Sequence, residues 1–590
     1  MKQKCKDNRL PIWSEVAFSA LASVIIVLSH KFATDGTLFF IDAGKDSFST
    51  CISYIYQMVL LGFLLFLSCC FFEHLFFKRA LADIKKIYFP WFHYGRTKRD
   101  LINALILFCL LLPAFLALYP GYQSYDAPMA AETFLQNGHL DAQQPVLHTI
   151  FTAGCYVLGN SITGNYQTGV LIYALIQELA VIVIYVIVSD KLIELKVPDL
   201  VIGIPTVLLF INPIVQTFIF ATDKDTLYGA FALLWVVYLV DGYRKSDMDV
   251  ISLSISALMM CQMRKQGIYI LIITFLICSV AHIRRLRSVR YPHLAASFLI
   301  PIACSMIISG PIYSVMGIGT DNPAEKLSVP IQQISRVVAT EKDSVANEDL
   351  EIIYKYLPED SFAAYIPEIS DPVKSCFNND LYSENKADFW RVWWKLFDSH
   401  KKAYIDAWLY LVVGYFCPDA GATNNWGYVA PFVTFLGEEF HQEPILHGYN
   451  QYLMSASSSM LNGAPFLSNF ICISMPFWVM AYLAFLALTK RKKTAAICII
   501  PSLLYFATLL IGPVCCIRYV LPLYMQLPAL IASHFIDDKQ YEKDYPNARE
   551  SQSLSPFAIE AENTQTELNS GGATGLTRRN NMHSRTRQQS

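Results

Sequence analysis

The sequence is poor in charge and lacks the short motifs by which many soluble enzymes bind phosphate or activate a nucleophile. Only 16% of its 590 residues are charged, whereas a soluble protein of this size carries about 25%. No Gly-rich phosphate loop, Gly-x-Ser-x-Gly or Cys-x-x-Cys occurs. The net charge of −2 and the lack of a basic module give no indication of a nucleic-acid partner. A hydrophobic content of 54% indicates a membrane protein instead.

Cysteine is present, but its placement argues against a disulfide or metal framework. Most of the 15 cysteines fall inside apolar runs, where a small buried hydrophobic side chain is the expected role. These are Cys69, Cys70, Cys109, Cys261, Cys278, Cys304, Cys515 and Cys516. Only Cys376 and Cys417 lie in or beside a long polar region, so a bridge between them is the disulfide that the sequence leaves open.

Long hydrophobic runs recur along the whole chain. About twelve windows approach the length, roughly 17–25 residues, that a helix needs to cross a bilayer. They fall at about 14–32, 52–77, 101–118, 166–189, 199–220, 226–241, 250–263, 267–282, 294–312, 470–489, 494–512 and 514–534. The sequence therefore predicts an all-α polytopic membrane protein.

Three shorter or flanked runs need separate treatment. The first window follows several basic residues but is long and has no clear cleavage pattern, so we expect an uncleaved anchor rather than a signal peptide. The runs 145–159 and 403–417 are too short or interrupted for a confident span. We expect them to lie on the outer leaflet or to dip into it.

The basic loops predict the orientation. Segments 78–100, 283–293 and 490–493 carry the strongest clusters of Lys and Arg, which mark the cytoplasmic side. Placing them inside leaves both termini in the cytoplasm. The first loop, 119–165, the turns at 223–225 and 264–267, and the segment 313–469 then face outward.

This threading divides the chain into five regions. They are a two-helix region (1–100), a core membrane region (101–312), an extracytoplasmic segment (313–469), C-terminal membrane helices (470–535) and a tail (536–590). The tail is polar and without hydrophobic periodicity, so we expect it to be disordered and cytoplasmic.

The first outer loop carries two candidate catalytic residues. Asp126 follows a helix exit and the Pro120–Gly121 turn, and a carboxylate at this interface is placed to take a proton from an alcohol nucleophile. His148 lies on the first turn of a short helix that Pro145 begins. The alternatives are a solvated loop aspartate and a structural histidine.

Cations and carboxylates also gather in the short outer turns. Asp223–Lys224–Asp225 leaves almost no loop between two spans, so its charges must be solvated, paired or used for binding. Arg264 and Lys265 lie between two short apolar runs, at a depth where an ionisable pair suggests function. With Arg518 near the start of the last span, they suit an anionic ligand such as a lipid phosphate. Snorkelling to ordinary headgroups is the alternative.

The long external segment adds aromatic and metal-like patterns of low specificity. Its tryptophans, Trp390, Trp393, Trp394, Trp408 and Trp426, fit an interfacial belt better than sugar-stacking platforms. Its residues Glu438, Glu439, His441, Glu443 and His447 match no strong metal spacing. We therefore assign no metal ligands and no cofactor, and leave a divalent metal open.

The order of these motifs resembles integral-membrane glycosyltransferases of the GT-C type, which include protein O-mannosyltransferases and aminoarabinose transferases. The nearer likeness is to uncharacterised bacterial membrane proteins of this class. It rests on a Lys-Asp-Thr turn, an Arg-x-x-Gly turn, a Pro-x-Gln-x-x-x-Arg segment and an Arg-Tyr-x-x-Pro segment, over about 100–535. Here these motifs read Lys224–Asp225–Thr226, Arg264–Gly267, Pro330–Gln332–Arg336 and Arg518–Tyr519–Pro522.

The resemblance implies a polyprenyl-phosphate sugar donor and an inverting transfer outside the cytoplasm to a glycan or lipid acceptor of the cell envelope. It places the chain in a bacterial cytoplasmic membrane, among membrane lipids. It makes Asp126 the candidate base, with Lys224, Arg264, Lys265 and Arg518 toward the donor phosphate. Asp225, Gln332, Arg336 and Tyr519 would support the site. Where the family pattern leads us to expect His-His-Pro, the chain has Gln143–Gln144–Pro145, so a role is not carried onto that position.

Two other classes remain open. A lipid-linked-saccharide transporter or flippase should have an internal repeat between its halves, and none is evident. A polysaccharide polymerase or ligase of another fold would share both the substrate and the location.

Overall fold

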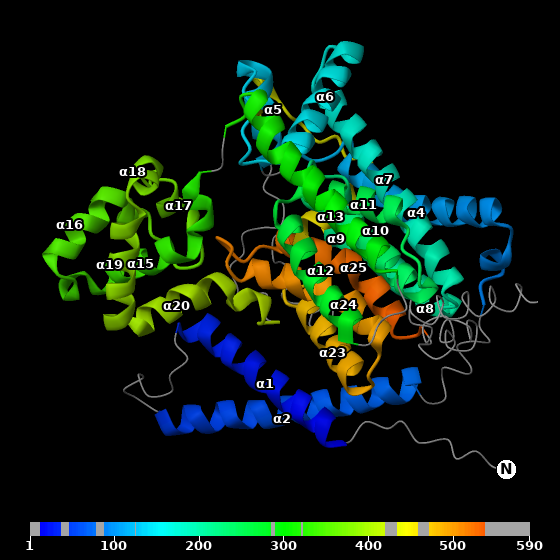
Figure 1. Ribbon diagram of the computed structural model, residues 1–590, viewed down its shortest axis with the longest axis horizontal. Helices are drawn as coiled ribbons and strands as arrows, with labels where there is room; N and C mark the ends of the chain where they lie inside the picture. Colours follow the sequence, from blue (N-terminus) through cyan, green and yellow to red (C-terminus); the bar gives the residue numbers. More distant parts are fainter. Residues whose placement is uncertain are drawn as a thin grey trace, which may run out of the picture. The chain divides into compact units, whose positions relative to one another are not determined.

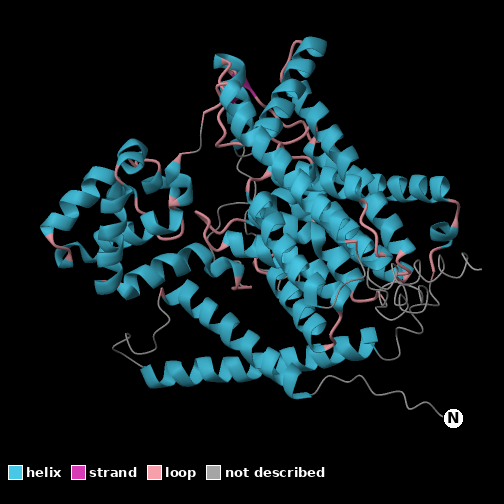
Figure 2. Cartoon of the chain, in the orientation of Figure 1, coloured by secondary structure: helices cyan, strands magenta, loops and turns pink. Residues whose placement is uncertain are grey.

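The computed structural model describes residues 12–36, 47–77, 88–123, 126–284, 290–319, 322–418, 434–457 and 471–536. Apart from one pair of two-residue strands, the secondary structure of these residues is helical (Figure 2), which confirms the predicted all-α class. Backbone contacts divide the chain into two units, Met1–Ile536 and Asp537–Ser590. The tail, for which we expect disorder, lies outside the described residues, as does Trp426.

Each of the twelve predicted apolar windows contains a described helix. These helices are α1 (Ile12–Asp35), α2 (Ser47–Phe77), α4 (Arg96–Leu118), α7 (Gln167–Glu194), α8 (Asp199–Phe210), α9 (Pro213–Ile219), α10 (Lys224–Lys245), α11 (Val250–Met263), α12 (Gln266–Arg284), α13 (Tyr291–Ile307), α23 (Met475–Thr489), α24 (Lys493–Leu509) and α25 (Ile517–Ser533).

Six of the described helices are long and apolar enough to cross a membrane, or up to seven if the bent pair α8–α9 counts as one span. Shorter apolar helices are α11, α12, α23 and α24. By length and composition this is a helical membrane protein. The count of twelve spans stays a prediction.

Helix α10 lies at the centre of the bundle. It packs against α7, α11, α24 and α25 (Figure 1), and 78% of its most apolar window is buried. In α2, by contrast, only 6% of the corresponding window is buried. Exposed apolar side chains such as Val59 and Phe63 suit contact with lipid.

The break between α8 and α9 has a local cause. Asn212 caps α9 by accepting a hydrogen bond from the Ile214 amide, and Pro213 occupies the first turn, where its missing N–H costs nothing. The two helices are bent by 71°. At its other end, helix α9 is followed by a short turn, Phe220–Asp223, which leads directly into α10.

Helices α5 (Asp126–Asn137) and α6 (Val146–Thr163) follow α4, and α6 packs against α7. Segment 322–418 forms its own apolar core. Its helices are α15 (Ser328–Glu341), α16 (Asn347–Tyr356), α17 (Asp371–Lys374), α18 (Asn379–Glu384), α19 (Lys386–Ser399) and α20 (Lys401–Val412).

Strands β1 (Thr434–Phe435) and β2 (Glu438–Glu439) form a small antiparallel pair before α21 (His447–Ser457). The remaining elements are η1 (Pro90–His93), the π-helix η2 (Ile308–Ile312), α14 (Tyr313–Val315), η3 (Pro323–Lys326), η4 (Lys342–Ser344), η5 (Glu359–Ala364) and η6 (Val413–Tyr415).

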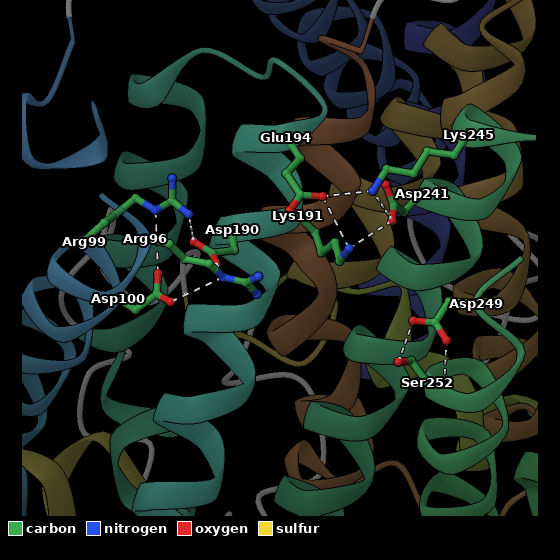
Figure 3. Close-up of polar contacts among 10 residues, drawn as sticks. All are labelled: Arg96, Arg99, Asp100, Asp190, Lys191, Glu194, Asp241, Lys245, Asp249 and Ser252. Atoms are coloured by element: carbon green, nitrogen blue, oxygen red, sulfur yellow. Dashed lines mark hydrogen bonds and ion pairs between the residues drawn. The ribbon is translucent and has the colours of Figure 1, made fainter. Parts of the chain in front are cut away.

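Basic residues of the predicted cytoplasmic side are paired with buried carboxylates (Figure 3). Arg99 of α4 lies 2.5 Å from Asp190 of α7. Lys191 and Lys245 lie 3.2 and 3.0 Å from Asp241 of α10. These ion pairs join α4 to α7 and α7 to α10 at one end of the bundle. Lys191 and Lys245 also lie in the last turns of α7 and α10, where a positive charge interacts favourably with the helix dipole.

Candidate functional site

The segment after α4 is joined to the turn before α10 by backbone hydrogen bonds. The Tyr122 amide donates to the Phe220 carbonyl at 2.9 Å, and the Thr222 amide donates to the Tyr122 carbonyl at 2.9 Å. This short parallel bridge continues, after residues 124–125, into α5. As a result Asp126, the first residue of α5, lies beside Lys224, the first residue of α10.

The start of α10 and the residue before it carry three charged side chains that are largely removed from solvent. Asp223 and Asp225 are buried, and the Lys224 side chain is 16% exposed. Carboxylates in the first turn of a helix are favoured by its dipole. Burial of this many charges is costly unless each is paired or binds a ligand.

Asp225 is neutralised within the protein. Its carboxylate accepts a hydrogen bond from Arg264, the residue directly after α11, and lies 3.6 Å from Arg518 Nε. The Arg264 guanidinium lies over the rings of Tyr505 and Tyr519, at 5.9 and 5.0 Å from their centroids. Arg264 and Asp225 thus form a buried pair covered by aromatic rings.

Asp126 lies between two cations and remains half-exposed. Its Oδ2 is 3.4 Å from Arg518 Nη1 and 3.9 Å from Lys224 Nζ, and its side chain is 44% exposed. Lys224 also donates to the Gln144 side chain. Partial burial alone would raise the pKa of Asp126, but Arg518 and Lys224 outweigh it and hold the pKa below its usual value. Asp126 is therefore an ionised carboxylate at neutral pH.

These side chains line one small pocket. Its walls are Asp126, Ala127, Gln144, His148, Thr149, Asp223, Lys224 and Arg518. The Oδ2 atom of Asp223 is buried, and it has no hydrogen-bond partner among the described residues. Burial and the neighbouring Asp225 carboxylate raise the pKa of Asp223 to about 7. Cations, an ionised carboxylate and further acceptors together suit a ligand that has both anionic oxygens and hydroxyl groups.

A family model matches residues 130–549, which is more than half of the chain. The chain belongs to the family of unknown function DUF6020. No curated protein and no solved structure matches it. In this DUF6020 member, the pocket residues from Gln144 to Arg518 lie inside the matched range, and Asp126 precedes it closely.

The DUF6020 structure brings most of the sequence-predicted residues together. Asp126, His148, Lys224 and Arg518 line the pocket. Asp225, Arg264 and Tyr519 form the layer behind it. Lys265 is exposed and donates to the Ala142 carbonyl, so it holds the segment between α5 and α6 and is not among the pocket residues.

Gln332 and Arg336 lie in α15 and do not line the pocket. Gln332 donates to the carbonyls of Ile366 and Pro367 at 2.6 and 2.9 Å. Arg336 lies 3.6 Å from Asp406 and over the Tyr410 ring. These contacts stabilise segment 322–418.

The segment held by Gln332 continues to the loop before Arg518. The Ser370 amide donates to the Pro513 carbonyl at 3.0 Å, and Ile369 forms an isolated bridge with Val514. Ile369 and Val514 also pack in one small apolar cluster, against which Tyr519 lies. Gln332 is thus connected to Arg518 through the backbone of these two loops.

Four residues that sequence reasoning did not assign to the site contribute to it. Gln144 and Asp223 line the pocket, and Tyr173 and Gln177 of α7 lie directly behind His148. A glutamine inside a long apolar span is an unusual feature, so Gln177 could have been recognised from the sequence. Tyr173 gives no such signal, because tyrosine is common in apolar helices.

The metal left open by the sequence finds no site in the described part of the chain. No group of three or more His, Cys, Asp or Glu residues there is placed to hold a metal ion. Glu439 and His441, which belong to the metal-like pattern, lie 3.2 Å apart on exposed side chains. Among the described residues Cys376 is an exposed, free cysteine, so no disulfide joins it to Cys417.

Proposed function

We propose that this protein is a GT-C-like membrane glycosyltransferase that moves a sugar from a polyprenyl-phosphate donor to a glycan or lipid acceptor of the cell envelope. The observation that carries the proposal is the pocket in which Lys224 and Arg518 flank the ionised Asp126. The two cations can bind the phosphate of the donor, and the adjacent carboxylate can accept the proton of an acceptor hydroxyl.

The proposed reaction is an inverting displacement at the anomeric carbon. The acceptor oxygen forms a bond to this carbon while the bond to the phosphate oxygen breaks. Asp126 accepts the hydroxyl proton, and the polyprenyl phosphate leaves with the bonding electron pair, stabilised by Lys224 and Arg518. Because the acceptor oxygen becomes acidic only as its new bond forms, a carboxylate with a lowered pKa can still accept this proton late in the step.

The proposal divides the cations by their contacts. Lys224 and Arg518 line the pocket and would contact the phosphate. Arg264 is committed to Asp225, so its role in donor binding would be indirect, through the position of the α10 turn. Lys265 would act through the segment between α5 and α6 that it holds.

The proposed location is a bacterial cytoplasmic membrane crossed about twelve times, with the pocket facing outward. Support comes from the basic loops, which agree on one cytoplasmic side. Asp126 follows the end of α4, whose first turn lies in basic segment 78–100. Lys224 begins α10, which ends in Arg244 and Lys245. Arg518 follows the end of α24, which begins at Lys493. A polyprenyl-linked donor suits such a site, because it needs no soluble nucleotide.

Transfer by the purified protein tests the proposal. The protein in lipid nanodiscs is given polyprenyl-phosphate esters of several radiolabelled hexoses together with membrane glycolipids. We expect release of polyprenyl phosphate and label on the acceptor, both lost in Arg518→Gln but kept in Arg391→Gln, which changes an arginine that is 64% exposed in segment 322–418. Donor binding without turnover for every hexose would favour a lipid-linked-saccharide transporter, and absence of binding would reject the phosphate site.

A further inference from the structure

A chain of buried hydrogen bonds runs from the pocket into α7. His148 Nε2 lies 2.8 Å from the Tyr173 hydroxyl, which lies 2.9 Å from Gln177 Oε1. Tyr173 and Gln177 are completely buried, and His148 is 2% exposed. The chain ends at the backbone of the turn between α9 and α10, which Gln177 contacts.

The acceptors around Gln177 fix the orientation of its amide. The Nε2 atom lies 3.1, 2.9 and 2.9 Å from the carbonyl oxygens of Phe218, Ile219 and Ala221. Carbonyl oxygens only accept hydrogen bonds, so the amide nitrogen must face them and Oε1 must face Tyr173. Gln177 thus supports the end of α9 and the turn that carries Asp223.

The direction of the remaining bonds follows. The Tyr173 hydroxyl has a single proton, and its neighbours other than His148 are Gln177 Oε1 and, at 3.4 Å, the Asp223 carbonyl. Both only accept hydrogen bonds, and if the proton went to His148 Nε2 instead, the buried Gln177 Oε1 would lose the donor that it has in Tyr173, so the hydroxyl proton is directed to one of these two oxygens. The Tyr173 oxygen must then accept from His148, and His148 carries its proton on Nε2.

A histidine protonated on Nε2 and neutral presents Nδ1 as an acceptor. Burial, reinforced by the positive charge of Lys224, lowers the pKa of His148 to about 3, which agrees with a neutral ring. No described residue hydrogen bonds to Nδ1. His148 lines the pocket together with Lys224 and Arg518, so Nδ1 is the ring nitrogen that remains for a ligand.

We propose that Gln177 and Tyr173 lock His148 in the Nε2-protonated form, and that His148 Nδ1 accepts a hydrogen bond from a hydroxyl of the bound phosphate ester. This inference rests on the proposed function and narrows it. The ligand is a phosphate ester that carries a free hydroxyl within reach of its phosphate, as a glycosyl phosphate does. His148 binds and orients this hydroxyl, and Asp126 remains the group that accepts the proton.

The tautomer can be measured without a substrate. The 15N resonances of His148 in histidine-labelled protein, assigned by their loss in His148→Gln, should report a neutral ring protonated on Nε2. They should not titrate between about pH 5 and pH 8, the range in which an ordinary histidine changes charge. In Tyr173→Phe the lock is removed, and we expect a mixture of tautomers. If His148 in the unmodified protein carried its proton on Nδ1, or titrated in this range, the proposal that Gln177 and Tyr173 hold it in the Nε2-protonated form would be wrong.

Binding tests the ligand part with one matched variant. Glutamine at position 148 places its amide nitrogen near the former Nε2 and keeps a donor to Tyr173, but it has no acceptor at the Nδ1 position. The probes are decyl phosphate and its glucosyl, mannosyl and galactosyl esters. We expect His148→Gln to bind decyl phosphate as the unmodified protein does, and to bind its preferred glycosyl ester about threefold to tenfold more weakly, the loss of one hydrogen bond.

The outcomes separate the two proposals. Unchanged binding of the glycosyl ester by His148→Gln would overturn the role of His148 and leave the proposed function standing. Equal weakening for decyl phosphate and its esters would assign His148 to the shape of the pocket and also overturn the inference. Failure of the unmodified protein to bind any of the probes would reject the proposed function, and the ligand role of His148 with it.

Discussion

Replacing Asp126 with Asn separates catalysis from binding at this site. The change removes one negative charge while keeping the size of the side chain and most of its hydrogen-bonding capacity. If Asp126 is the base, its loss should lower the rate of transfer by about 10²–10⁴. The same change leaves Lys224 and Arg518, at 3.9 and 3.4 Å from the former carboxylate, without this counter-charge.

Binding of the phosphate should therefore become tighter as turnover falls. Two unit charges about 4 Å apart interact by about 1 kcal/mol at the dielectric constant of water, and the half-exposed Asp126 lies near this limit. Removal of its repulsion with a bound phosphate corresponds to about a fivefold lower Kd. If Asp126 were only a solvated loop aspartate, its replacement by Asn would change neither the rate of transfer nor the Kd for the phosphate.

The assay measures both quantities on the same preparation in nanodiscs. Kd for decyl phosphate is determined by titration, and kcat is determined from release of polyprenyl phosphate. Asp141→Asn serves as the control, because asparagine keeps the Oδ1 that accepts the Gln143 amide at 2.8 Å. Folded Asp126→Asn protein that transfers sugar at nearly the normal rate would refute the assignment, and Asp223 would become the next candidate because it also lines the pocket.

The pH dependence of transfer gives an independent check. Arg518 and Lys224 lower the pKa of Asp126 against the effect of its partial burial. A base with a lowered pKa stays ionised as the pH falls, so the acid limb of kcat should lie below the usual aspartate value of about 3.9. Removing one cation with Lys224→Gln should move this limb to higher pH. An acid limb near pH 6 in the unmodified enzyme would contradict the role of Asp126.

Three further predictions concern orientation and the layer behind the pocket. Cysteine at the exposed position Lys355 should react with a membrane-impermeant maleimide from outside intact cells, and labelling only after lysis would reverse the topology. Arg264→Ala should lower the free energy of unfolding by about 3–5 kcal/mol because it leaves Asp225 charged and buried, and adding Asp225→Asn should restore most of the loss. Thermal unfolding in detergent measures this, and purely additive losses would mean that the two side chains are not coupled. Gln332→Ala should raise Kd for decyl phosphate severalfold by loosening the loops that lead to Arg518, whereas an unchanged Kd would show that segment 322–418 does not position the site.

The sequence determined the helices, because hydropathy is a local property. Each apolar window contains a helix, and the break between α8 and α9 follows from Asn212 and Pro213. Hydropathy did not determine which helix lies at the centre. Helix α2 has the higher mean hydropathy, 2.2 against 1.4 for α10, yet α10 is the buried one. Lipid and protein interior are both apolar, so hydrophobicity alone cannot distinguish them.

The sequence also identified most of the charged residues of the site, because ionisable groups at the ends of apolar helices are rare and costly. Their partners were decided by the tertiary structure alone. Asp126 and Arg518 lie 392 residues apart in the chain and 3.4 Å apart in space. Arg264, which the sequence suggested for the donor phosphate, is paired with Asp225, because the packing of α11 against α10 brings these two side chains together. Gln177 acquires its role only where the end of α9 turns three carbonyl groups toward α7, and no spacing along the chain records which faces of two helices meet.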